Sequence, residues 1–432
     1  MKKLSILALA ALLVVAFTVP AAALENEFGG YWRTRFYQMG HFDGEDGDAG
    51  TYRLVDTRTR LYYTAKINDN LKLVNKFEMD ATWGGPDQSR AAAAAGNRGY
   101  GEMGADGANI EIKNSYADFN TGPVNWTVGV QPYRLFRSFF IDDDDAGLIA
   151  RWPIGKAFGV AGSWLKAYEG GPDGGNNDDI DSYTLSGWMY FSEHMSIKPS
   201  VNLTYSSDYS GYVGVPAGEL YRWTYGLDFD MDFDNFGLWA TAVGQAGTLK
   251  DLAIVGDQDF KGYLFGVGGN IALGPVDIHT QGFYASGDDD ATDGDIDSFS
   301  AERASYYWAE ILGYGIFDYA VPTGSPGDKI TNIWAVNLGT TIKPMDKLSA
   351  TVDLWYAKRA EDIGGIDPAT GLPWGGEDEL GTELDVVVTY QLVEGLNLDL
   401  VGAYLWAGDA VSTDGSNDKD PYEFGARLSL SF

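Results

Sequence analysis

The sequence of 432 residues contains no cysteine, only 3 histidines, and 30 lysines and arginines against 62 acidic residues. The lack of cysteine excludes disulfide frameworks and thiolate metal sites. The formal net charge of −32 argues against nucleic acid as a partner, because binding to phosphates requires a basic face. These absences exclude both a disulfide-stabilised domain and a nucleic-acid-binding protein.

Long apolar runs are also scarce, and the one clear example lies at the N-terminus. Lys2 and Lys3 precede an apolar run from Leu4 to Val19, which leads to three alanines. This is the pattern of a secretory signal peptide, and the run is short for a membrane span of about 20 residues. We therefore predict that residues 1–23 are cleaved and that residues 24–432 form a single domain.

The last twelve residues show the clearest regular pattern in the rest of the chain. In an extended strand, successive side chains point to opposite faces. One face of this segment is apolar and the other is small, polar or charged. The apolar face carries Tyr422, Phe424, Ala426, Leu428, Leu430 and Phe432, and the other carries Glu423, Gly425, Arg427, Ser429 and Ser431.

The same alternation recurs from Asn26 onward. Tyr221, Trp223, Tyr225 and Leu227, for example, share one face of a predicted strand. Very short turns alternate with long polar loops throughout. The pattern predicts about eighteen strands, with about sixteen as the alternative, and the even number places both ends of the chain on the same side.

The aromatic C-terminus and the alternating final strand resemble the closing strand of Gram-negative outer-membrane porins. The resemblance implies an all-β protein, a transmembrane antiparallel up-and-down β-barrel in the cell outer membrane, with short periplasmic turns and long extracellular loops. It also implies recognition of the final strand, through Phe432, by the barrel assembly machinery. Further expected partners are outer-membrane lipid and lipopolysaccharide, small hydrophilic solutes, and other copies of the chain in a homotrimer.

A shorter stretch is similar to a strand and acidic loop of the alginate-export and related large porins. The strand is Val128-Gly129-Val130-Gln131, with Val130 at the position of an arginine in that family, and the acidic run is Asp142 to Asp145. We interpret 132–146 as a loop, followed by a strand near 147–152, and 362–378 as another long loop. The first loop either folds inward and forms a constriction or is a solvated outer loop.

Polar rows would line a water-filled lumen if the apolar rows face lipid. A basic arc opposite an acidic wall would create a transverse field that acts on passing solutes. The alternative is that the arginines pair with lumen carboxylates simply to fill the wall. The candidate pore-lining residues are Arg33, Arg35, Arg58, Arg60, Lys76, Lys113, Arg134, Arg137 and Arg427, with Asp142, Asp143, Asp144, Asp228, Asp230, Asp353 and Asp385.

Catalytic and metal motifs are missing from the sequence. No histidine belongs to a recognisable Ser/His/Asp arrangement, and the acidic loop around Asp288 to Asp295 has Ala291 where an EF-hand needs its second ligand. We expect neither enzyme activity nor a cofactor or metal site. We predict a porin for passive diffusion of small hydrophilic solutes and ions. A plugged structural or adhesive barrel and a secreted carbohydrate-binding β-protein are the alternatives.

Overall fold

The structure is a computed structural model that describes residues 25–47, 51–83, 110–170, 178–213, 216–253, 255–290, 293–303, 306–313, 315–317, 325–327, 329–366, 373–412 and 415–432. The predicted signal peptide and residues 84–109 lie outside these residues. No helix in the described part of the chain is both long and apolar enough to cross a membrane.

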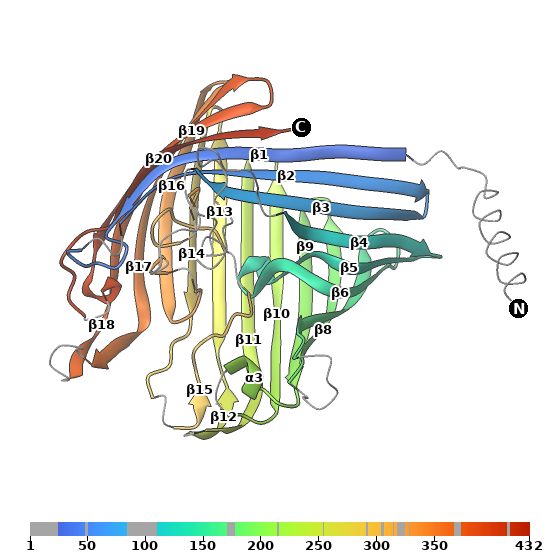
Figure 1. The fold of residues 1–432 in the computed structure, drawn as a ribbon, viewed down its shortest axis with the longest axis horizontal. Coiled ribbons are helices and arrows are strands. Elements are labelled where there is room, and N and C mark those ends of the chain that lie inside the picture. Colours follow the sequence, from blue (N-terminus) through green and yellow to red (C-terminus); the bar gives the residue numbers. More distant parts are fainter. Residues whose placement is uncertain are drawn as a thin grey trace, which may run out of the picture.

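Antiparallel strands make up most of the described chain (Figure 1). They are β1 (Glu25–Gly40), β2 (Tyr52–Asn68), β3 (Leu71–Thr82), β4 (Glu111–Thr121), β5 (Val124–Leu135), β6 (Ile141–Pro153), β7 (Phe158–Tyr168), β8 (Ile180–Ser192), β9 (Met195–Ser206), β10 (Leu220–Phe233), β11 (Phe236–Leu252), β12 (Gly256–Phe260), β13 (Tyr263–Leu273), β14 (Val276–Ala285), β15 (Asp295–Ile296), β16 (Ile333–Met345), β17 (Leu348–Ile366), β18 (Pro373–Val393), β19 (Leu396–Ala407) and β20 (Tyr422–Ser431). Short helical turns are η1 (Phe136–Ser138), α3 (Ser210–Val213) and η2 (Asp409–Val411).

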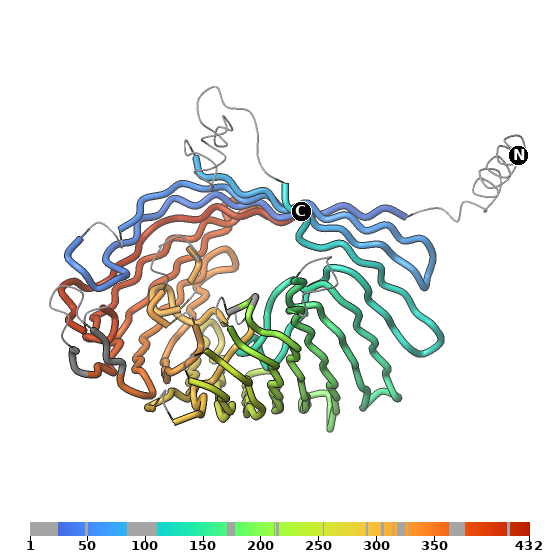
Figure 2. Tube along the Cα trace, turned by 60° about the horizontal axis from the view of Figure 1, so that its bottom comes forward, coloured from blue at the N-terminus to red at the C-terminus, as the bar shows by residue number. Residues whose placement is uncertain are grey.

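Eighteen of the described strands form a closed ring. Each barrel strand pairs antiparallel with the next, and β20 pairs with β1 from Tyr31↔Ser431 to Gly40↔Tyr422. The short strands β12 and β15 pair with each other outside this order. In Figure 2 the red C-terminal strands lie beside the blue N-terminal ones. The predicted fold, an antiparallel barrel of about eighteen strands closed by the last strand, is confirmed.

Period-two alternation orients the strands as expected. On β10 the side chains of Trp223, Tyr225 and Leu227 are exposed on the outer face, whereas Thr224 between them is buried. An exposed apolar row around a closed barrel is stable against lipid, where every backbone group pairs with a neighbouring strand.

Two predicted loops are wrong in extent. β5 continues to Leu135 and β6 begins at Ile141, so that the predicted loop 132–146 shrinks to 136–140. The four aspartates at 142–145 lie on β6, in register with residues 131–134 of β5. β17 and β18 likewise extend into the predicted loop 362–378. Backbone pairing continues through these polar runs because neighbouring side chains satisfy the charges, as Arg134 does for Asp142 at 3.0 Å.

A hydrophobic cluster fills part of the barrel interior. The β14–β16 connection contributes buried Phe299, Ile311, Leu312 and Phe317 to this cluster. Inward-facing residues of β1, β14, β16, β17 and β19 pack around them, together with the turn at 136–140. The yellow-to-orange trace inside the ring in Figure 2 includes this connection. The connection and the turn are the inward elements that shape the lumen.

Candidate functional site in the barrel lumen

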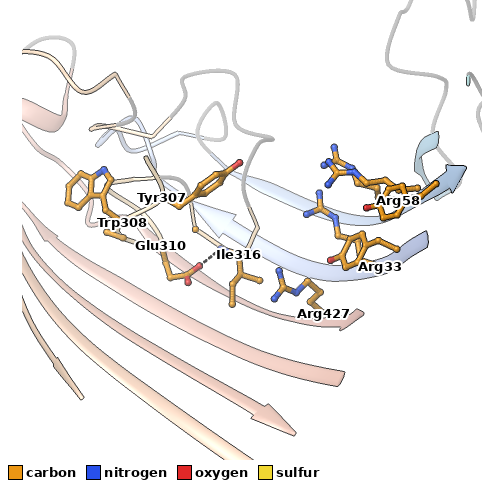
Figure 3. Close-up of a pocket in the computed structure, with 12 residues that line it drawn as sticks. Arg33, Arg58, Tyr307, Trp308, Glu310, Ile316 and Arg427 are labelled. Atoms are coloured by element: carbon orange, nitrogen blue, oxygen red, sulfur yellow. Dashed lines mark hydrogen bonds between the residues drawn. The ribbon is translucent and has the colours of Figure 1, made fainter. Parts of the chain in front are cut away.

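A cavity of about 560 Å³ lies between the barrel wall and the β14–β16 connection (Figure 3). Its wall side consists of Tyr31, Arg33, Arg58, Arg60, Tyr62 and Arg427, and its other side of residues 307–310, 315 and 316. We call this space the arginine cavity. Its four arginines come from three neighbouring strands, β1, β2 and β20.

Strand register brings these arginines together. Arg33 on β1 lies opposite Arg58 on β2, and Arg60 is two residues further along the same face. Closure of the barrel sets β20, with Arg427, on the other side of β1. The sequence predicts a cluster of Arg33, Arg35, Arg58 and Arg60 joined by Arg427, because alternate residues of adjacent strands share a face. All of these except Arg35 line the cavity.

Carboxylates on flanking strands hold the guanidinium groups from the side. Arg58 Nη2 lies 2.6 Å from Asp80, and Arg60 pairs with Glu78 on the same strand, β3. Arg427 Nε donates to Asp399 of β19 at 2.8 Å. Planar guanidinium groups restrained in this way keep their remaining N–H groups in a defined orientation. The interpretation that arginines pair with lumen carboxylates therefore describes these three contacts.

Arg35 has a different position from the other predicted arginines of the first two strands. It is only 3 % exposed, donates through Nη2 to Asp56 at 2.6 Å, and its Nη1 reaches the carbonyl of Ile316 at 3.5 Å. It thus lies behind the connection and is not among the residues that line the arginine cavity.

Glu310 of the connection provides an acidic group opposite the arginines (Figure 3). Its Oε2 accepts a hydrogen bond from the backbone N–H of Ile316 at 2.7 Å. Burial, together with the nearby charge of Glu383, raises the pKa of Glu310 to about 7. The sequence did not single out this residue, because the connection has no periodic pattern that predicts its path into the lumen.

The other predicted pore-lining residues lie outside the arginine cavity and contact neighbouring strands or the connection. The contacts are Lys76 with the Tyr62 ring at 5.3 Å, Lys113 with Asp144 at 2.6 Å, Arg134 with Asp142 at 3.0 Å, Asp143 with Arg303 at 2.9 Å, Asp228 with Thr241 at 2.6 Å, Asp353 with His279 at 2.8 Å, Asp385 with the N–H of Glu310 at 3.3 Å, and Arg137 with Asp230.

A second basic cavity of about 580 Å³ lies at the turn between β5 and β6. It brings together Arg134, Arg137 and Asp228 of the predicted set. The turn residues Phe136, Arg137 and Ser138 all have positive φ, at 51°, 53° and 71°. Residues other than glycine rarely adopt this backbone conformation, so surrounding contacts must hold it. Arg137 provides them by pairing with Asp230 and lying 4.6 Å over the Trp239 ring.

Comparisons with known proteins agree with the barrel architecture. A family model described as alginate export matches residues 203–422, about half of the chain. The structure of OccK8 (OprE) from Pseudomonas aeruginosa is similar, with 9 % identity, a TM-score of 0.58, and coverage of 94 % of this chain and 98 % of that one. OccAB3 from Acinetobacter baumannii has 8 % identity, a TM-score of 0.57 and coverage of 94 % and 99 %. OpdK from Pseudomonas aeruginosa, solved with vanillate, has 8 % identity, a TM-score of 0.56 and coverage of 94 % and 98 %. Among curated proteins, no sequence matches this chain.

Proposed function

Because the chain belongs to the alginate export family and folds as an outer-membrane barrel of the porin type, we propose that it is a channel for passive diffusion of small hydrophilic solutes. The arginine cavity is its filter for small organic anions. Contact with lipopolysaccharide, recognition of the final strand by the assembly machinery, a homotrimer and the lack of enzyme activity stay predictions.

The observation that supports this function is the convergence of Arg33, Arg58, Arg60 and Arg427 on one cavity. A guanidinium group matches the planar, two-oxygen geometry of a carboxylate better than an ammonium group does. The opposing Glu310 is largely protonated below a pH of about 7, so that it cancels little of this positive charge there. The similar barrel OpdK was solved with vanillate, a small organic anion, which supports the choice of solute class.

The flanking carboxylates make the filter selective without making it a tight binding site. Asp80 pairs with Arg58, Asp399 pairs with Arg427, and Glu78 pairs with both Arg60 and Arg58. These pairs weaken the field at the cavity centre. A diffusion channel needs a site that attracts a solute and also releases it. Paired guanidinium groups that line a water-filled space meet both conditions.

A plugged structural barrel is the second candidate. Ile311, Leu312 and Phe317 of the connection are fully buried inside the barrel, so that part of the lumen is filled by the chain itself. Such a barrel would show no conductance above that of the lipid bilayer.

Planar-bilayer recording separates the two candidates and tests the filter. The test variant is Arg33→Gln/Arg58→Gln/Arg60→Gln/Arg427→Gln. The matched control removes the same charge from four lysines that do not line the cavity, with Lys66→Gln/Lys250→Gln/Lys261→Gln/Lys358→Gln.

We expect wild type and the control to conduct with similar reversal potentials in a salt gradient, and the test variant to shift toward cations. Absence of conductance from the folded wild type would sink the channel proposal. Equal reversal potentials for test variant and wild type would show that the arginine cavity is not the filter.

A further inference from the structure

The β14–β16 connection meets the barrel wall at a group of four carboxylates, of which the three on the wall are buried. These are Glu310 of the connection, Glu383 and Asp385 of β18, and Glu423 of β20; we call them the carboxylate cluster. Glu383 is 0 %, Asp385 4 % and Glu423 2 % exposed. Ionised carboxylates are rarely buried to this degree without cations or hydrogen-bond donors of their own.

Backbone N–H groups of the connection satisfy part of the cluster. The two oxygens of Glu383 accept from the N–H groups of Ile311 and Leu312, at 2.6 and 2.8 Å. Asp385 accepts from the N–H of Glu310 at 3.3 Å. The segment at 310–313 is therefore docked on the wall through the carboxylates themselves.

Other oxygens of the cluster have no donor. Neither oxygen of Glu423, nor Oδ1 of Asp385, has a hydrogen-bond partner among the described residues. Glu423 and Glu310 are close enough to interact electrostatically. A carboxylate only accepts hydrogen bonds, so two neighbouring carboxylates can bond to each other only when one of them carries a proton.

Nearby cations do not balance the cluster. Arg35 and Arg427 face it, but Arg35 also pairs with Asp56 and Arg427 with Asp399. The four carboxylates of the cluster, Asp56 and Asp399 carry six negative charges if all are ionised, and the two guanidinium groups leave four of these in excess. On the cavity side of Glu310 stand Arg33, Arg58 and Arg60, the last two paired with Asp80 and Glu78.

A metal ion does not fit this arrangement. Within the described part of the chain, the one set of three or more metal-ligating groups whose atoms all lie within 4.8 Å of one another is Asp288, Asp289 and Asp297, which is not part of the cluster. Protons remain as the ligands that can neutralise the buried charge.

We propose that the carboxylate cluster is a proton-binding site that docks residues 310–313 on the wall when protonated and releases them when ionised, so that protons control the width of the arginine cavity. The effect on the cavity rests on the channel function proposed above. The docking equilibrium does not depend on it.

The direction of the pH dependence follows from Glu310. Burial raises its pKa from the ordinary 4.5 to about 7, so that the docked state holds the proton more tightly than the released state. Docking is therefore strongest below pH 4.5, and it weakens about tenfold per pH unit up to about pH 7, where the dependence levels off. The total change for this one proton is about 300-fold.

Hydrogen exchange read by mass spectrometry measures docking directly on the folded, detergent-solubilised barrel. The observable is the protection of the Ile311 and Leu312 amides between pH 5 and pH 8, corrected for the intrinsic pH dependence of exchange. Because this window starts above pH 4.5, we expect wild-type protection to fall across it by up to about 70-fold. Glu310→Gln and Glu423→Gln, which remove a charge with little change of shape, should retain protection at pH 8.

Asp277→Asn on β14 is the matched control, because it removes a carboxylate outside the cluster and should behave as wild type. Protection that is equal at both pH values in wild type would overturn the proposal, as would Glu310→Gln following the wild-type profile. Folding of each variant is checked by heat-modifiable gel migration, and Glu310→Gln, which lies outside the strands, keeps the test open if Glu423→Gln does not fold.

Bilayer conductance supplies the functional arm. We expect conductance to rise from pH 5 to pH 8 in wild type and to be flat in Glu310→Gln. Exchange that changes with pH in a barrel without conductance would support the cluster and refute the channel. Conductance together with pH-independent exchange would support the channel and refute the proton-binding role of the carboxylate cluster.

Discussion

Replacement of Arg60 by Gln tests the arginine cavity at one charge. A sphere of the cavity's volume of 560 Å³ has a radius of about 5 Å, which sets the distance from the Arg60 guanidinium to a solute at the centre. In a water-like dielectric, a unit charge at about 5 Å contributes about 0.8 kcal/mol. Loss of this charge should lower the occupancy of a monovalent anion about fourfold.

Glu78 provides the internal comparison. It pairs with Arg60 from the neighbouring strand and lies further from the cavity centre. At about 8 Å from the solute, the charge of Glu78 repels an anion by about 0.5 kcal/mol, so that the intact Arg60–Glu78 pair attracts the anion by only about 0.3 kcal/mol. The double variant Arg60→Gln/Glu78→Gln should therefore change anion occupancy by less than about twofold.

Reversal potentials in a potassium chloride gradient, and block of the current by a small carboxylate, measure both effects. The single variant should shift strongly toward cations and the double variant only slightly. Equal shifts in the two variants would mean that Glu78 does not act on the same space as Arg60. A shift toward anions in Arg60→Gln would refute the electrostatic reasoning altogether.

Two further predictions concern stability and the inward turn. Gly129→Ala should destabilise the barrel by about 1–3 kcal/mol and lower the temperature at which heat-modifiable migration is lost. Gly129 has φ +129°, and a Cβ there would lie 2.2 Å from the Ser115 carbonyl oxygen. Gly402→Ala is the control and should melt as wild type, because a Cβ added at Gly402 would have no atom within 4 Å. Arg137→Ala removes the Asp230 pair and the Trp239 contact that hold three residues at positive φ. This variant should show more current noise and more proteolytic cleavage at the turn. An unchanged cleavage pattern would show that the turn is held by its buried phenylalanines instead.

Period two was enough to predict the barrel wall. Side-chain faces, the strand number and closure of β20 on β1 all follow from the alternation and the turn spacing. The predicted arginine cluster follows from them too, but Arg35 of that cluster contacts the connection and does not line the cavity. Each of these depends only on which face of a strand a residue occupies, and on which strands are neighbours.

Residues inside the barrel could not be predicted in the same way. Glu310 lies opposite Arg33 although the two are far apart in sequence, and the connection that carries it has no repeating pattern. The acidic run Asp142 to Asp145 indicates a loop from sequence alone, because charge runs favour solvent. Its backbone instead pairs with β5, and its carboxylates find partners on other elements that a single strand's sequence does not reveal.

The seam between β1 and β20 sets Arg35 directly opposite Arg427. Like charges in facing positions repel, and Asp56 on β2 and Asp399 on β19 each pair with one of these two arginines. A first strand that met the last before β2 and β19 were in place would therefore be pushed apart. Closure of the ring is therefore favoured once both flanking hairpins have formed, and a slip of one residue at this seam would turn the side chains of the last strand to the opposite face.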